Sequence, residues 1–137
     1  MLPEWILKRQ EVEKSKNELC GADLSDAKLM KAQLEQADLS QADLTNAYLI
    51  KANLKGANLS DANLSGTILS EANLQDADLA DAELSDTYLC GADLSRVVNL
   101  TCDQLELAIL DKQTILPDYI RITWINEDLF DCEECGG

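Results

Sequence analysis

The residue types that most often carry catalysis are scarce in this chain. No histidine occurs among its 137 residues, which removes the commonest general base and the commonest metal ligand. Carboxylates are plentiful, but they recur in one slot of a five-residue period, as at Asp23, Asp38, Asp43, Asp78 and Asp93. Surface positions of a repeat explain such acids better than a catalytic pair does. The sequence therefore predicts a protein that is not an enzyme and holds no cofactor.

The cysteines are the second candidate for chemistry. Cys132 and Cys135 form a single Cys-x-x-Cys motif. A four-ligand zinc site would need two further ligands, and Cys102 is the only spare candidate nearby. We interpret the motif as two incidental thiols in a flexible tail and predict no metal site. Metal binding and redox chemistry at Cys132 and Cys135 are the alternatives.

Net charge limits the partners. The formal net charge is −15 and the sequence pI is near 4.1, whereas nucleic acids and anionic membranes attract basic surfaces. We therefore predict no direct contact with nucleic acid and none with a membrane. The five cysteines, an odd number, and an N-terminus without the regions of a signal peptide favour the cytoplasm.

A strict repeat dominates the middle of the chain. From Leu19 to Leu94 every fifth residue is leucine, and alanine stands two places before each leucine from 22 to 92, except at Thr67 and Thr87. A period of five would spread leucine over every face of a helix. In a straight strand it would alternate leucine between the two faces. Both conflicts disappear if each pentapeptide forms a short extended side followed by a corner, so that four of them close a coil of about twenty residues with leucine and alanine inside.

Tandem four-residue motifs carry a family resemblance. Ala-Asp-Leu-Ser occurs at 22–25 and 92–95, Ala-Asp-Leu-Thr at 42–45, and Ala-Asn-Leu-Ser at 57–60 and 62–65. These motifs resemble the A(D/N)LXX signature of the pentapeptide-repeat family. The resemblance implies an all-β solenoid, a right-handed quadrilateral parallel β-helix of about four coils. The ends of a solenoid need caps, and we expect an N-terminal capping helix and a short C-terminal helical or irregular cap.

We expect four segments: residues 1–16 as the N-terminal capping helix, 17–96 as the β-helix, 97–125 as the C-terminal cap, and 126–137 as an acidic flexible tail. A short succession within the cap, Gln-Leu, Ala-Ile-Leu-Asp and Thr-Ile-Leu-Pro, resembles the terminal segment of cyanobacterial members of the family.

Several signals lie inside the predicted C-terminal cap. Asn99 occupies the slot of the next leucine, so the register slips by one residue. Thr101 and Gln104 match a capping box, which predicts a short helix through residue 107. Residues 108–111 are expected to form one extra rung, residues 114–117 to cross the end of the core, and residues 120–125 to form a strand or a packed segment.

One outward stripe departs from the polar pattern. Slots that hold polar residues on the other three sides hold Lys28, Tyr48, Ile68 and Tyr88 here. The candidate partner-binding residues on this side are Met30, Lys31, Tyr48, Ile50, Lys51, Ile68 and Tyr88. The stacked side chains are interpreted in two ways: as pairs that only support each other, or as a docking face. Such a face would receive a protein partner, a second copy of the chain, or the folded-back C-terminal segment.

These observations predict a protein-binding or scaffold module that is a monomer or a weak dimer. The alternative is a DNA-mimicking inhibitor of a DNA-binding enzyme such as gyrase, a role that the resemblance to gyrase-protecting members of the family implies. Four rungs at about 4.8 Å each give a tower of roughly 20 Å, whereas one duplex turn is about 34 Å long. The resemblance also implies phenylalanine at many inward sites of those members, whereas all sixteen inward sites here are leucine.

Overall fold

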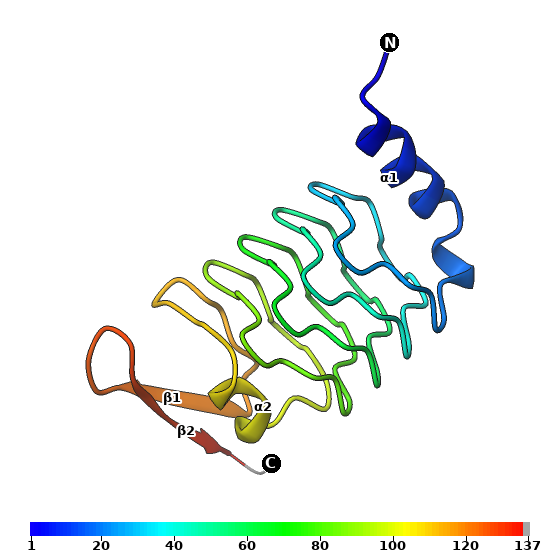
Figure 1. Cartoon of the computed structure of the whole chain (residues 1–137). Helices are drawn as coiled ribbons and strands as arrows, with labels where there is room; N and C mark the ends of the chain where they lie inside the picture. Colours follow the sequence, from blue (N-terminus) through cyan, green and yellow to red (C-terminus); the bar gives the residue numbers. More distant parts are fainter. Residues whose placement is uncertain (136–137) are drawn as a thin grey trace.

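The chain winds as a stack of coils. The computed structural model describes residues 1–135, and Figure 1 shows the coils lying between an N-terminal helix and a C-terminal hairpin. Parallel β-bridges join residues twenty positions apart, as between Asp23 and Asp43. The Leu24 N–H, for example, donates to the Asp43 C=O at 2.8 Å. Each coil carries bridging residues five positions apart, separated by turns.

The two periodic residues of the repeat make the core. All leucines of the period from Leu19 to Leu94 are buried, and so are the alanines from Ala32 onward. Each alanine N–H closes a turn onto the leucine three residues earlier, as from Ala52 to the Leu49 C=O at 3.0 Å. Alanine therefore sits on the inner side of a tight corner, where extra methylene groups would force the backbone to shift.

The corners have a special backbone conformation. Every fifth residue from 21 to 96 has a left-handed φ, between 56° and 70°, which is the region that the third residue of a type II turn requires. A residue three positions earlier, usually Asp or Asn, supports the corner: an oxygen of Asp23 accepts the Ser25 N–H at 3.1 Å. At the corner residue Gly66 an added Cβ would meet the Oδ1 atom of Asn46.

Thr67 and Thr87 replace alanine inside the stack without leaving an unpaired hydroxyl. Both side chains are fully buried. The Thr67 hydroxyl donates to the Leu44 C=O at 2.6 Å, and the Thr87 hydroxyl donates to the Leu64 C=O at the same distance. Because each buried hydroxyl has an acceptor in the preceding coil, its desolvation is compensated.

Helix α1 (Glu4–Lys14) lies over the first coil and is followed by the short 3-10 helix η1 (Lys16–Glu18). Pro3 precedes the first turn, and Val12 is the buried residue of the helix. The helix thus lies within residues 1–16, the segment that the sequence predicts as the N-terminal capping helix.

Side chains of α1 bind backbone groups on the open edge of the first coil. The Gln33 N–H donates to the Glu13 carboxylate at 2.7 Å. The Arg9 guanidinium donates to the Met30 C=O at 3.0 Å. These groups would otherwise bond to a preceding coil that does not exist.

The register slips after the last full coil, as predicted. Asn99 has a φ of 65°, and the next bridges join Tyr88 to Ile109 and Asp93 to Ile115. Their separations exceed twenty residues, so an insertion has entered the coil. One expectation was wrong: residues 114–117 do not cross the end of the core, because Ile115 continues a side of the stack through its bridge.

Helix α2 (Cys102–Glu106) follows the slip and begins with the predicted capping box of Thr101 and Gln104. The Gln104 amide also donates to the Leu79 C=O at 2.8 Å and to the Ala82 C=O at 3.0 Å. One side chain therefore starts the helix and also satisfies carbonyl groups of the coil below it.

Strands β1 (Ile120–Trp124) and β2 (Phe130–Glu134) form an antiparallel hairpin at the C-terminal end. The prediction of a flexible tail over 126–137 was wrong for β2. Two interactions that the sequence pattern does not reveal hold this segment: its hairpin pairing with β1, and a long-range disulfide between Cys102 and Cys132. Residues 136 and 137 of the predicted tail lie outside the described residues. No helix among residues 1–135 is long and apolar enough to span a membrane.

Candidate functional site: the tyrosine face

One side of the stack carries a ladder of large, partly exposed side chains. Successive parallel bridges join Lys28 to Tyr48, Tyr48 to Ile68, Ile68 to Tyr88, and Tyr88 to Ile109. Tyr48 is 40% exposed, Tyr88 42% and Ile109 38%. We call this side the tyrosine face and include in it the flanking residues Met30, Lys31, Ile50 and Lys51.

Local alternation explains why these residues point outward. Each ladder residue directly precedes a buried leucine, as Tyr48 precedes Leu49, and successive side chains of an extended segment point to opposite faces. The bridges place like positions of adjacent coils about 4.8 Å apart. Stacked residues therefore contact one another while keeping one surface free.

The face is apolar along its centre and charged along one border. Lys31 and Lys51 occupy left-handed corner positions and are exposed. The Lys51 ammonium lies 4.0 Å from the Glu71 carboxylate, and both side chains are more than half exposed, so this ion pair contributes little to stability. Lys31 has no carboxylate within 4.0 Å among the residues that the structure describes. Its ammonium is therefore available to an anionic group.

The face continues toward the N-terminal helix. Trp5 and Lys8 of α1 line a hollow together with Lys28 of the first coil. Glu4 and Asp26 complete its lining, so cationic and anionic side chains are balanced there. This end of the face offers an aromatic ring, and its lining charges cancel.

The structure brings all seven predicted site residues to this one side, and it removes one of the alternative interpretations. The C-terminal segment does not fold back over the face, because the β1–β2 hairpin is attached at the end of the stack and Tyr48 and Tyr88 stay exposed. The sequence prediction placed residues 108–111 on an extra rung but left Ile109 out of the site, whereas its bridge to Tyr88 extends the ladder. Its signal was the Ala-x-Leu spacing of Ala108 and Leu110, displaced by the register slip.

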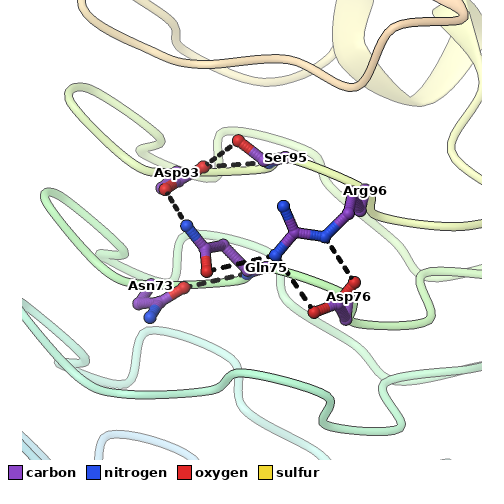
Figure 2. Close-up of polar contacts among 6 residues, drawn as sticks. All are labelled: Asn73, Gln75, Asp76, Asp93, Ser95 and Arg96. Atoms are coloured by element: carbon purple, nitrogen blue, oxygen red, sulfur yellow. Dashed lines mark hydrogen bonds and ion pairs between the residues drawn. The ribbon is translucent and has the colours of Figure 1, made fainter.

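A polar network on another side joins the carboxylates of Asp76 and Asp93 to neighbouring coils (Figure 2). The Gln75 amide donates to Asp93 at 2.6 Å, and the Ser95 hydroxyl donates to the same carboxylate at 2.5 Å. The Arg96 guanidinium donates to Asp76 at 2.9 Å. Each carboxylate is thus engaged in holding one coil to the next.

The pKa values of these acids agree with a structural role. The hydrogen bond from Arg96 lowers the pKa of Asp76 below its ordinary value. Burial raises the pKa of Asp93, but hydrogen bonds from Ser95 and Gln75 together lower it by a larger amount. The net shift of the Asp93 pKa is therefore also downward. A general acid at neutral pH needs the opposite shift. Neither carboxylate has the properties of a proton donor.

The cysteines do not gather as the zinc alternative would require. Cys102 and Cys132 form a disulfide, whereas Cys135 is free. Among residues 1–135 there is no group of three or more cysteine, aspartate or glutamate side chains arranged to hold a metal ion. The tyrosine face is therefore the candidate site that the geometry offers.

Comparisons with known proteins agree with the repeat. A family model described as pentapeptide repeats, in eight copies, matches residues 27–66 and 57–96. Among the curated proteins no match is found.

Two solved structures from the cyanobacterium Nostoc are similar to this chain. HetL, a pentapeptide repeat protein involved in heterocyst differentiation regulation, is 38% identical with a TM-score of 0.51, over 55% of this chain and 36% of HetL. This chain therefore spans only about a third of HetL. The pentapeptide repeat protein alr5209 is 32% identical over 82% of this chain and 85% of its own, with a TM-score of 0.46.

A third solved structure, full-length QnrB1, is a plasmid-mediated fluoroquinolone resistance protein. It is 17% identical with a TM-score of 0.30, over 71% of this chain and 88% of its own. A likeness at this level supports no argument about fold or function.

Proposed function

Because the chain belongs to the pentapeptide-repeat family, we propose that it is a non-enzymatic protein-binding module that docks another protein on its tyrosine face. We take its scaffold to be the right-handed quadrilateral β-helix expected from the resemblance. Parallel bridges at twenty-residue intervals support that scaffold. A rigid stack of this kind presents a fixed surface and needs no ordering when a partner binds.

The observation that carries the proposal is the exposure of two tyrosines on one ladder, two coils apart with Ile68 between them, whereas the equivalent outward slots of the other three sides from residue 23 to 93 are polar. Tyr48 and Tyr88 keep about two fifths of their surface in contact with solvent. Aromatic side chains of this kind are enriched at protein interfaces and often supply about 2 kcal/mol or more each when a partner buries them. Residues at the equivalent slots of the next side, such as Asn53 and Asn73, offer no such anchor.

Charge defines the kind of partner. Lys31 and Lys51 border the apolar ladder in a protein whose net charge is −15. A partner with an apolar strip and carboxylates along one edge is therefore complementary to the face. Attraction at the border is screened over about 10 Å at 0.1 M salt, so the complex should weaken as salt rises.

The test compares two double variants in a pull-down from cells that express the protein. Tyr48→Thr plus Tyr88→Thr removes both aromatic anchors, and Asn53→Thr plus Asn73→Thr is the charge-neutral control on the next side. We expect the first variant to lose the bound protein and the control to retain it. Both should stay folded: each cross-strand pair lost with a tyrosine costs only about 0.2 to 1 kcal/mol, and in the control each amide acceptor lost by the Lys55 or Gln75 N–H costs about 0.5 to 1.5 kcal/mol. Equal capture by both variants would contradict the docking role.

The gyrase-inhibitor alternative has weaker support. The likeness to QnrB1 carries no argument, and lysines and tyrosines interrupt the negative surface that a DNA mimic needs. A DNA supercoiling assay with purified gyrase separates the two functions, since a binding module of the kind proposed leaves the supercoiling rate unchanged.

Localisation in the cytoplasm remains part of the proposal. Its support is the set of three free thiols, Cys20, Cys90 and Cys135, because cytoplasmic reductants keep such thiols reduced. Fractionation of the expressing cells tests it.

A further inference from the structure

Three cysteines lie in the C-terminal cap, and two of them are crosslinked. The disulfide joins Cys102, the first residue of α2, to Cys132 in the middle of β2, with a Cα–Cα distance of 5.6 Å and a sequence separation of 30 residues. Cys135 follows β2 as a free, half-buried thiol. The tyrosine face uses none of these residues.

The disulfide is the covalent link between the hairpin and the stack, and the other attachments are noncovalent. A two-stranded hairpin is marginally stable on its own in water. At the base of this hairpin the Tyr119 hydroxyl donates to the Val97 C=O at 3.0 Å, and the buried Ile120 adds an apolar contact. Farther along, Trp124 and Phe130 pack edge to face with ring centroids 5.4 Å apart, and both are partly buried against the core. The crosslink thus fixes the centre of the hairpin covalently, at the Ile122–Cys132 pair, whereas partly buried apolar contacts hold the half distant from Tyr119.

We propose that the Cys102–Cys132 disulfide is a redox modification site, at which a dithiol reductant breaks the crosslink and releases the C-terminal hairpin from α2. This inference is independent of docking on the tyrosine face.

The two sulfur atoms differ in access, which sets the direction of attack. Cys102 is 8% exposed, whereas Cys132 is the more exposed partner. A thiolate of the reductant attacks the Cys132 Sγ atom, the Cys102–Cys132 bond breaks, and Cys102 leaves as a thiolate that takes a proton from solvent. The second thiol of the reductant then attacks the mixed disulfide and releases Cys132. The reductant becomes a disulfide, and the cysteine pair gains two electrons and two protons.

The rest of the chain indicates a reversible crosslink. Cys20, Cys90 and Cys135 are free, and Cys20 is exposed. Where exposed thiols stay reduced, the disulfides that do form are mostly transient or redox-sensing. The same disulfide in a permanently oxidising compartment would stand beside three unpaired thiols.

The surroundings select among reductants. Asp131 and Glu133 flank Cys132 in β2 and are exposed, and Asp103 follows Cys102 in α2. These carboxylates repel an anionic monothiol such as glutathione. A neutral dithiol, or a dithiol protein that presents a neutral or basic surface, is the favoured class.

The experiment measures thiol state and hairpin opening together. The full chain carrying Cys20→Ser and Cys90→Ser, which removes two thiols of the coils, is treated with dithiothreitol or with glutathione at equal thiol concentration. Alkylation and intact mass then count the free thiols. Backbone hydrogen exchange follows residues 120–134, with residues 24–94 as the internal control.

We expect dithiothreitol to reduce the disulfide in native buffer faster than glutathione does. Exchange in residues 120–134 should then rise roughly tenfold or more, as for loss of a local constraint, without change in the coils. The further variant Cys102→Ser plus Cys132→Ser should show the fast exchange with no reductant present. The free Cys135 is alkylated in either state, so the proposal is overturned if Cys102 and Cys132 of the untreated protein are also alkylated, if reduction requires a denaturant, or if exchange stays slow after complete reduction.

Discussion

The coils and the C-terminal cap supply hydrogen-bond partners to their backbone groups in different ways. In the coils, Leu54 is fully buried and its N–H donates to the Asn73 C=O of the next coil, a bond that equivalent residues repeat along the stack. In the cap, single side chains replace the missing coil: the Tyr119 hydroxyl accepts the Leu100 N–H at 2.9 Å, and the Gln104 amide satisfies two carbonyl groups. The five-residue pattern is sufficient to pair the backbone where one coil follows another. Individual long-range contacts are necessary where the repeat stops.

The largest expected difference between the two regions concerns apolar burial. Leu54→Ala should lower the free energy of unfolding by about 2 to 5 kcal/mol, because it leaves a cavity between close-packed coils. Leu116→Ala in the cap should cost clearly less, because Leu116 is only partly buried. Denaturant unfolding of both variants measures this. Equal losses would mean that the cap packs as tightly as the coils.

Removing a single hydrogen-bonding side chain should lower stability more in the cap than in the coils. Tyr119→Phe removes the partner of the Leu100 N–H and of the Val97 C=O. We expect a loss of about 1 to 3 kcal/mol, the usual cost of leaving buried polar groups unpaired. Tyr88→Phe is the matched control, since its exposed hydroxyl makes no hydrogen bond to the described residues, and it should change stability by less than about 0.5 kcal/mol. A Tyr119→Phe protein as stable as the control would show that water replaces the hydroxyl.

The corners allow a smaller, internal comparison. Gly21 and Gly66 have nearly the same φ, 70° and 69°, so alanine at either position adopts a left-handed conformation that costs about 1 to 2 kcal/mol. An added Cβ at Gly21 meets nothing within 4 Å, whereas at Gly66 it meets the Asn46 side chain. Gly66→Ala should therefore lower the melting temperature more than Gly21→Ala does. The reverse order would mean that Asn46 rotates away at no cost.

The smallest expected effect is a pH dependence of stability that arises at Asp111, where the coils meet the cap. Burial raises the pKa of Asp111, but hydrogen bonds, among them those from the Gly91 and Gln113 N–H groups, together lower it by a larger amount. The pKa of Asp111 therefore lies below its ordinary value. A carboxyl group with a lowered folded pKa stabilises the protein above its unfolded pKa of about 4 and loses that effect as the pH falls through the folded value. Unfolding curves at about pH 5 and pH 3 should show a smaller acid-induced loss for Asp111→Asn than for the wild type. The same loss in both proteins would assign the acid sensitivity to other groups.

Part of the candidate site could be predicted, and part could not. The twenty-residue recurrence of Tyr48, Ile68 and Tyr88 was sufficient to place them on one side. The sequence also placed residues 108–111 on an extra rung, but the insertion before Ile109 breaks the twenty-residue count, so the period could not assign Ile109 to a particular side. Their exposure was beyond the sequence as well, because it depends on where the C-terminal hairpin lies.

By itself the sequence determined the inward leucines and alanines, the coil of twenty residues, the register slip at Asn99, and the capping box of Thr101 and Gln104. Each of these follows from neighbours a few residues apart or from a strict period. Only the tertiary structure decided that Glu13 binds the edge at Gln33, that Ile115 continues a side of the stack, and that Cys102 joins Cys132. These contacts connect segments about 20 or more residues apart that share no period, so their formation depends on how the ends of the stack are closed in space.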